Sequence, residues 1–581
     1  MAAQRDAHPT LLSTLEGIID QFACLNYENW HDPIMKMLKQ VLAKFYHISF
    51  ENRNNVENIP FTPQMSNLLR KLTITFSNGV DMYVKQSQEE SESSKARSDS
   101  QKRQQTSMNI QECQRLKGQF IQDFDHLQED SKKFHILIYK LKKWIKILEN
   151  YTKTVPKSWY LEEKCRFLSN FSRQTFDSIA LPGEFISKMT NGSNVYIAKF
   201  MPRVEVVFKE NTIARRIFIR GHNGRIYPYL IFNDVSSIEA RLEERFLQFQ
   251  RLTNMYFCKN KETARRLLNF TIPKVVAYGP ANRLVEDNVS SLSLLEIHKQ
   301  YLANKNLTPD VCLSKYFERL AAIQSKGAQA TPQTLRDIVS EMQESLAPPT
   351  LIREWAFQTY NNATEFWHFR KLFTQQLSLS NLCEYAFFLN PLNPEMLNFH
   401  RDSGLVSISY FRFDLHDESG DVINSNSFAQ QVPFRLTHSI QNFITKCGLQ
   451  GPFTSTMIAT SSCFTNPNYK VRSFLLAILR DEVISWHKRV RQNEKIQLIA
   501  QLHNTIRENK NPPNNEAAIQ QILTAMASEP KDISSHDLTN MSIKAANSIF
   551  SRLKSIFCLF IFCLFFYLNF LFFFFFRYCN I

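Results

Sequence analysis

The sequence predicts an α+β chain in which a helical bundle precedes a small β-rich lobe and a larger helical lobe. Three observations predict this order. Apolar residues recur every three or four positions up to about residue 147, alternate with polar residues between 203 and 232, and return to helical spacing after Pro349. With 581 residues, 44% of them apolar, the chain could hold three or four domains with cores of their own.

Residues 1–155 are expected to form helices. Trp30, Ile34, Leu38 and Val41 keep a helical spacing, and the stretch "LIYKLKKWIKIL" does so again. Between these stretches, residues 86–109 are polar and charged, without apolar periodicity. This composition predicts a disordered insert.

Residues 162–290 are predicted to form the small lobe. Residues 203–208, 215–220 and 225–232 alternate as strands, and the "GHNG" at 221–224 is typical of a hairpin turn between the last two. A charged helix is expected to follow at 237–252.

Residues 291–491 are predicted to form the helical lobe, followed by a linker over 492–540. Its longest helix is expected at 364–389, with Asn361, Asn362 or Thr364 as the N-cap. We expect a β-hairpin next, with residues 397–400 paired to 406–413 across Ser403-Gly404.

Charge and cysteines narrow the class of protein. The net charge of +15 permits acidic partners, but the basic residues are spread along the chain, so direct nucleic-acid readout is not expected. The cysteines before the C-terminal tail form no C-x-x-C pair, and no signal peptide precedes them. These features indicate reduced thiols in an intracellular protein, with no metal site.

Several blocks closely resemble one family. The stretches "LKGQFIQDFD", "ARRIFIRGHNGRIYPYLIFND", "LNPEMLNFHRDSGLVSISYFRFDLHDESGD" and "VPFRLT" are similar to the phosphatidylinositol-3-kinase-related kinases, above all to their scaffold member, a pseudokinase. The resemblance covers residues 5–490 in order. It implies the end of a FAT region with a bundle like the rapamycin-binding region over 1–155, a two-lobed kinase-like domain, and a partial FATC element at 541–554.

The resemblance also implies which positions should carry chemistry. Active relatives use a lysine, an Asp-Arg-His-x-x-Asn loop and an Asp-Phe-Gly across a short hairpin, which together hold phosphate and magnesium. With the register anchored on Ser403-Gly404, these positions fall on Phe232 for the lysine, on Pro391, Leu392 and Asn393 for Asp-Arg-His, on Met396 for the asparagine, and on Tyr410, Phe411 and Arg412 for Asp-Phe-Gly. We therefore expect no catalytic residue, no cofactor and no metal.

A rival register takes the literal His400-Arg401-Asp402 as the catalytic loop. It needs an asparagine at 407 and finds Ser407, and it needs Asp-Phe-Gly near 420–422 and finds Gly-Asp-Val. Asp414 could supply a carboxylate only if the strand slipped by more than one residue. Asp402-Ser403-Gly404 is instead typical of a hairpin turn.

The implied function is a non-catalytic scaffold in histone acetyltransferase complexes of the SAGA and related kinds. In that role it would sit in the nucleus, bind other complex subunits and transcriptional activators, and serve transcription and DNA repair. The alternative is an active serine/threonine kinase of the same family. The chain resembles only part of that longer scaffold.

The segment 555–581 stands apart from the rest of the sequence. Its Phe-rich stretch 555–576 is uncharged and long enough to cross a bilayer, which would suit a tail anchor. Its narrow composition is also what translated non-coding sequence produces. Because the resemblance stops abruptly here, we expect a non-native tail and no membrane association.

Overall fold

The computed structural model describes residues 8–25, parts of 34–45, 63–93, 100–124, 134–153, 157–172, 179–184, 194–209, 212–233, 237–279, 282–308, 311–325, 331–413, 435–444, 451–485, 487 and 534–565. The chain divides into two compact units. Unit 1 comprises Met1–Val235, Val276–Glu286 and Arg491–Pro530, and unit 2 comprises Ser236–Val275, Asp287–Val490 and Lys531–Ile581.

Unit 1 begins with helices. They are α2 (Pro9–Cys24), α4 (Pro63–Ser93), α5 (Ser100–Asp123) and α6 (Phe134–Lys153). The rings of Phe76 and Phe120 stack at 3.9 Å, and the buried Trp144 packs against both. The indole Nε1 of Trp144 donates a hydrogen bond to Asp123 at 2.7 Å. The apolar stripe of the sequence therefore forms a bundle core.

The predicted disordered insert at 86–109 is wrong for most of its length. Helix α4 continues to Ser93 and α5 starts at Ser100, while residues 94–99 lie outside the described part. The segment is rich in Glu, Gln, Lys and Arg, which favour helices. Extending an existing helix also costs far less than nucleating one, so α4 and α5 continue into a polar segment without an apolar stripe.

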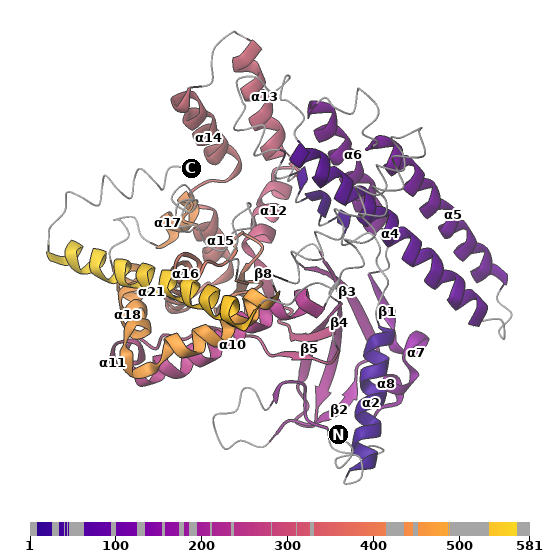
Figure 1. The fold of residues 1–581 in the computed structure, drawn as a ribbon, viewed down its shortest axis with the longest axis horizontal. Helices are drawn as coiled ribbons and strands as arrows, with labels where there is room; N and C mark the ends of the chain where they lie inside the picture. The colour runs from indigo at the N-terminus through magenta and orange to yellow at the C-terminus, as the bar shows by residue number, and fades with distance from the viewer. Residues whose placement is uncertain are drawn as a thin grey trace. The chain divides into compact units, whose positions relative to one another are not determined.

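Unit 1 also contains the main β-sheet, in which β3, β4 and β5 lie side by side (Figure 1). Its strand order is β1-β3-β4-β5-β7-β6, with β2 paired to β4. The strands are β1 (Ser158–Tyr160), β2 (Ile197–Phe200), β3 (Arg203–Lys209), β4 (Thr212–Gly221), β5 (Ile226–Asn233), β6 (Val275–Ala277) and β7 (Asn282–Glu286), and the short helices α7 (Leu161–Lys164) and α8 (Arg166–Asn170) follow β1. The three predicted strands and their hairpin turn are confirmed.

Unit 2 is mainly helical. Its elements are α10 (Ser237–Lys259), α11 (Lys261–Arg265), β8 (Ser291–Ser293), α12 (Leu294–Asn304), α13 (Val311–Ser325), α14 (Pro332–Leu346), α15 (Leu351–Thr359), α16 (Ala363–Phe387), β9 (Leu397–His400), β10 (Val406–Ile408), α17 (His438–Ile444), α18 (Pro452–Thr465), the 3-10 turn η5 (Pro467–Tyr469) and α21 (Ser535–Phe565). Residues 471–485 form a further helix.

Helix α16 runs through the core of unit 2, and its second half is almost entirely buried. Asn362 caps it, because its side chain accepts a hydrogen bond from the backbone N–H of Thr364 at 3.0 Å. The prediction had left three candidates for this cap, and the structure selects one of them.

Helix α10 belongs with the helical unit rather than with the sheet, so the grouping differs from the predicted small lobe at 162–290. The physical reason is aromatic packing. Phe246 meets Phe411 edge-on at 5.6 Å, and Phe249 meets Phe387 at 4.8 Å. These contacts place the apolar face of α10 in the core of unit 2.

Helix α21 covers the predicted partial FATC element at 541–554 but extends beyond it at both ends. It starts at Ser535, inside the predicted linker, and continues to Phe565, inside the predicted tail. The sequence between these ends contains no Pro or Gly that would stop a helix. Among the helices that the structure describes, none is both long and apolar enough to cross a membrane. Residues 488–533 and 566–581 lie outside the described part. These ranges contain most of the predicted linker and the end of the predicted tail.

Candidate functional site

The predicted β-hairpin is present in unit 2. Strands β9 and β10 pair antiparallel, with Val406 opposite Phe399, and β8 pairs with the other edge of β9. Gly404 closes the turn in the left-handed conformation, at a φ of 65°, which glycine adopts without strain. The second strand, β10, ends at Ile408 and is therefore shorter than the predicted strand at 406–413. His400-Arg401-Asp402 therefore lies at the end of β9 and in the turn, as the hairpin register requires.

His400 forms hydrogen bonds with two neutral side chains, and this arrangement does not suit proton transfer. Its Nδ1 lies 3.1 Å from Nδ2 of Asn288, and its Nε2 lies 3.0 Å from Oγ of Ser407. The backbone N–H of Ser290 donates to Oδ1 of Asn288 at 2.8 Å, and this bond fixes the orientation of the amide. Nδ2 must then donate to His400 Nδ1, so Nε2 carries the proton and donates to Ser407.

This tautomer argues against nucleophilic chemistry at Ser407, because a general base would need a free lone pair at Nε2. Burial lowers the pKa of His400, and the nearby Asp402 and Asp287 offset only part of that effect. Burial opposes the ionisation of Asp402, but hydrogen bonds from Ser290 and Asn288 outweigh it and leave its pKa below the usual value. These groups form a polar latch between β8 and the hairpin, which we call the Asn288 latch (Asn288, Ser290, His400, Asp402 and Ser407).

The segment predicted to correspond to Asp-Arg-His is held by hydrogen bonds to its backbone. The N–H of Leu392 donates to Oε1 of Glu384 at 3.2 Å, and the Leu392 carbonyl accepts from Nε of Arg435 at 2.6 Å. The Leu392 side chain is buried, whereas Pro391 and Asn393 are exposed. Asn393 turns the chain by accepting from the N–H groups of Glu395 and Met396.

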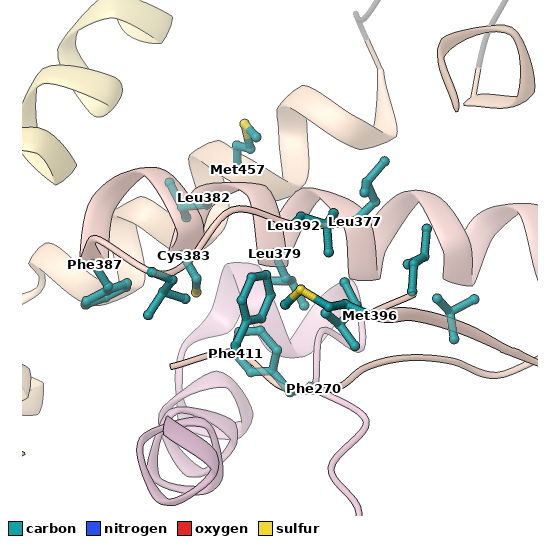
Figure 2. Packing of buried hydrophobic residues seen from close by; sticks show 14 of the residues in the cluster. Phe270, Leu377, Leu379, Leu382, Cys383, Phe387, Leu392, Met396, Phe411 and Met457 are labelled. Atoms are coloured by element: carbon teal, nitrogen blue, oxygen red, sulfur yellow. The ribbon is translucent and has the colours of Figure 1, made fainter. Parts of the chain in front are cut away.

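Apolar packing surrounds the position predicted to correspond to the metal-binding asparagine. Met396 is fully buried in the core of unit 2. Figure 2 shows Leu392, Met396 and Phe411 together beside α16, which contributes Leu379 and Cys383 to the same cluster. A thioether in such surroundings is a poor ligand for magnesium, which takes oxygen ligands.

The segment predicted to correspond to Asp-Phe-Gly is also fixed by hydrogen bonds. The N–H of Tyr410 donates to Oε1 of Glu243 on α10 at 2.9 Å, and the N–H of Arg412 donates to Oδ1 of Asn390 at 2.8 Å. Tyr410 has a φ of 64°, which is unusual for an aromatic residue. Phe411 is buried against Phe246.

Phe232, the residue predicted to stand at the position of the phosphate-contacting lysine, lies on β5 in unit 1. It is buried with Ala214 and Leu230 on one face of the sheet, while Tyr229 and Ile231 belong to the core cluster of the opposite face. The guanidinium of Arg283, the partner of Phe232 in the strand register, lies 5.1 Å from the Phe232 ring centroid. At the position predicted for the lysine, the structure therefore has a buried aromatic ring.

Glu384 is the most perturbed carboxyl group in this region. Burial raises its pKa to about 7, against the opposing effects of the Leu392 N–H and the Arg435 cation. In the described parts of the chain, no three His, Cys, Asp or Glu side chains gather as metal ligands do. The carboxylates near the aligned loops, Glu243 and Glu384, each accept a backbone N–H.

Sequence reasoning missed Glu243, Glu384, Asn288 and Arg435, which position the aligned segments. Each is a single polar residue within a helix or loop, without a motif around it. Only Glu384 carried a possible signal, because a carboxyl in the buried part of a long apolar helix needs a partner. Glu243, Asn288 and Arg435 are far in sequence from the residues that they contact, so no local pattern indicated them.

The chain is similar to several known proteins. The phosphatidylinositol 3- and 4-kinase family matches residues 239–488. The transformation/transcription domain-associated protein of Danio rerio is 45% identical over 556 residues, and the alignment covers 96% of this chain and 14% of that protein. The transcription-associated protein 1 of Drosophila melanogaster is 45% identical over 490 residues, which is 84% of this chain and 13% of that protein.

A more distant relative is the Saccharomyces cerevisiae SAGA complex/NuA4 acetyltransferase complex subunit TRA1, which is 29% identical over 409 residues, or 66% of this chain and 11% of that protein. The chain thus spans a small part of the length of the curated relatives it matches. The order of helical bundle, sheet, helical lobe and hairpin agrees with the predicted α+β, kinase-like fold. The chain therefore belongs to the transformation/transcription domain-associated protein family and carries a domain of the phosphatidylinositol 3- and 4-kinase class.

Proposed function

We propose that the chain is the non-catalytic, kinase-like part of a scaffold subunit of histone acetyltransferase complexes. Yeast relatives are named as subunits of the SAGA and NuA4 acetyltransferase complexes, which supports this assignment. Its partners are then the other subunits of such complexes and transcriptional activators. It acts in the nucleus, in transcription and DNA repair, without reading nucleic-acid sequence and without a membrane.

The observation that carries the proposal is the set of side chains at the aligned catalytic positions. Phosphoryl transfer needs a proton acceptor, two magnesium ligands and a phosphate-contacting lysine. Pro391, Met396, Tyr410 and Phe232 hold these places in the hairpin register, and none offers a carboxylate or an ammonium group. Without metals, the charge on the transferring phosphoryl group has no counter-charge.

The contacts around these residues support a domain that keeps a kinase-like fold but does not catalyse phosphoryl transfer. In unit 2 Met396 is buried in an apolar cluster, and in unit 1 Phe232 is buried against the sheet. The buried carboxyl group of Glu243 accepts the backbone N–H of Tyr410, so at least one of its oxygens supports the hairpin. A scaffold that keeps a rigid surface needs this kind of support.

The domain limits are part of the same proposal. We assign residues 1–155 to the end of the FAT region and its bundle, 162–290 and 291–491 to the small and the helical lobe, and 541–554 to a partial FATC helix. Helix α10 lies inside the first of the two lobe ranges but packs in the core of unit 2. The packing of α21 into the core of unit 2 supports the last assignment.

An active kinase is the alternative, and one observation favours it. Asp402 is a carboxylate with a lowered pKa next to His400 and Arg401, in a literal His-Arg-Asp. However, Asn288 Nδ2 donates to Asp402 at 3.3 Å, and the residue lies in the hairpin turn. The Asn288 latch therefore accounts for this carboxylate without catalysis.

A thermal-shift measurement distinguishes the two functions. The full chain is heated with millimolar ATP, with and without magnesium. We expect no magnesium-dependent rise in the melting temperature, because the metal and phosphate contacts are missing. A nucleotide at 100 times its dissociation constant would add about 2.7 kcal/mol, which is readily detected.

A magnesium-dependent rise that Asp402→Asn abolishes would support the alternative kinase and contradict the proposal. The scaffold role is tested separately, by measuring whether acetyltransferase activity co-purifies with the tagged protein from nuclear extract. Absence of that activity would contradict the scaffold role.

A further inference from the structure

Strand β4 presents cations on one face of the main sheet in unit 1. Ile217 of this strand is buried in the core cluster on the other face. Successive side chains of a strand point to opposite faces, so Arg216, Phe218 and Arg220 share the face that lies away from that core. The small apolar cluster around Phe232 occupies one end of the same face.

Strand pairing extends this face over the neighbouring strands. Residues directly opposite each other in an antiparallel pair share a face, and so do residues two apart on one strand. The pairs on this face are Arg216 with Glu205 of β3, Arg220 with Lys199 of β2, and Arg203 of β3 with Tyr160 of β1. We call Tyr160, Lys199, Arg203, Arg216, Phe218 and Arg220 the basic face.

A β-bulge places Lys199 on the basic face. Ile197 lies opposite Gly221 and Lys199 lies opposite Arg220, so two steps along β2 correspond to one step along β4. Without the extra residue, Lys199 would pair with Ile219, which is fully buried in the core. The bulge therefore brings two exposed cations into register.

The basic face has too few carboxylates for its cations. Strands β1 to β5 contain a single acidic residue, Glu205, whose carboxylate lies 3.2 Å from Nη1 of Arg216 and 3.9 Å from Nε of Arg203. In the described part of the chain, neither Lys199 nor Arg220 has a salt-bridge partner. Helix α7, whose glutamates follow β1 in the sequence, packs into the core of the opposite face. Like charges directly opposite each other destabilise a sheet, so stability does not explain this pair, and an anionic ligand would supply the missing charge.

Two aromatic rings on the basic face are available for stacking. Tyr160 keeps 59% of its surface exposed, and its ring contacts no other aromatic ring within the described ranges. Phe218 is half-buried and belongs to none of the apolar clusters that the structure describes. Nucleic-acid bases stack on rings of this kind while cations contact the backbone phosphates.

We propose that the basic face binds single-stranded nucleic acid, with its cations on the phosphates and its rings on the bases. Arg216 and Arg220 stand four residues apart on β4, which is about 13 Å at about 3.3 Å per residue. That span is too long for one phosphate group and fits successive phosphates of a strand. The contacts involve no base edges, so no sequence is read. This inference is independent of the scaffold role.

The test is fluorescence polarisation on the full chain with a labelled 20-nucleotide single-stranded DNA of mixed sequence. The charge variant is Lys199→Gln/Arg220→Gln. Its matched control is Lys146→Gln/Arg166→Gln, an exposed lysine and an exposed arginine on helices of the same unit. We expect the charge variant to weaken binding at least tenfold and the control to change it less than twofold.

Salt dependence shows whether the two cations contact phosphates. For a single strand, each lost contact reduces the slope of log association constant against log salt by about 0.7. The charge variant should therefore reduce the slope by about 1.4, and the control should leave it unchanged. An unchanged slope in the charge variant would overturn the proposal.

A further variant tests the rings without changing the charge. Tyr160→Leu should weaken binding at least fivefold, because the base loses its stacking surface. Tyr139→Leu replaces a similarly exposed tyrosine on α6 and should change binding less than twofold. Equal effects of these two variants would contradict the proposal. Circular dichroism confirms that all variants are folded.

Two unlabelled competitors of equal charge identify the class of ligand. Polyglutamate has no bases, and duplex DNA keeps its bases stacked inside the helix. Each should therefore compete at least tenfold more weakly than the single strand. If either competed as well as the single strand, the basic face would be a general anion surface and the proposal would be wrong.

Discussion

Glu384 on α16 is a buried carboxyl group that reverses the usual pH response of an acidic residue. Burial raises its pKa to about 7, above the ordinary value of 4.5. The folded state then holds a proton that the unfolded state has released. The stabilisation from this group is complete below pH 4.5 and is lost as the pH rises through 7.

Replacing Glu384 by Gln should therefore remove part of the pH dependence of stability. Between pH 5 and 8 we expect the free energy of unfolding of the unchanged protein to fall by about 1–3 kcal/mol more than that of the variant. Urea unfolding at several pH values measures this difference. The exposed Glu354→Gln is the control, and it should keep the slope of the unchanged protein. A slope that is equal in all three proteins would refute the assignment.

The Asn288 latch gives a second prediction about a single residue. Asn288→Ala removes the donor to His400 and the acceptor of the Ser290 N–H. Buried groups that lose a partner cost about 1–3 kcal/mol each, so a loss of that size is expected in urea unfolding. Asn361→Ala, at an exposed position before α16, should change stability by less than about 0.5 kcal/mol. Equal small losses in both variants would show that the latch contributes nothing.

The packing of helix α21 into the core could not be predicted from the polar residues at its N-terminal end. Its residues Ala545, Ala546, Ile549 and Leu553 enter the core of unit 2. Ser461 on α18 donates to the Leu553 carbonyl at 2.8 Å, and Arg552 lies over the Phe388 ring at 4.0 Å. Figure 1 shows α21, in yellow, lying along α18. The helix is thus an integral part of the helical unit.

Ile549→Ala should accordingly cost about 2–5 kcal/mol, since it leaves a cavity at a fully buried position. Ile543→Ala is the control on the same helix, because 38% of that side chain is exposed and little burial is lost. Denaturant unfolding compares the two. Should Ile549→Ala cost no more than Ile543→Ala, α21 would not be docked as described.

At the scale of the whole molecule, each unit has its own apolar cores. The bundle core and the core beneath the sheet belong to unit 1, and a large aromatic core belongs to unit 2. Cores that share no residues can loosen separately.

Mutations in different cores should therefore affect different segments. Leu141→Ala in the bundle should raise hydrogen exchange in α4, α5 and α6, and Ile549→Ala should raise it in α16, α18 and α21. Hydrogen-exchange mass spectrometry measures both. If either variant accelerated exchange equally throughout the chain, the independence of the cores would be refuted.

The sequence by itself determined the elements whose signals are local. Alternation predicted β3, β4 and β5, the turn residues predicted the hairpin at Gly404, and helical spacing with an N-cap predicted α16. The sequence also predicts Phe, Pro, Met and Tyr at the catalytic positions, and this register stays a prediction. The prediction of disorder for the polar segment at 86–109 was wrong, because most of that segment forms helix without an apolar stripe.

Tertiary structure alone decided how the aligned segments are held. The bond between Glu243 and Tyr410 joins positions 167 residues apart, and that between Asn288 and His400 joins positions 112 apart. The grouping of α10 with the helical unit depends on aromatic contacts between residues that are also far apart in the sequence. Local patterns report only which face of an element is apolar. Which partner a buried polar or aromatic side chain meets depends on how the chain packs, and no short stretch of sequence contains that information.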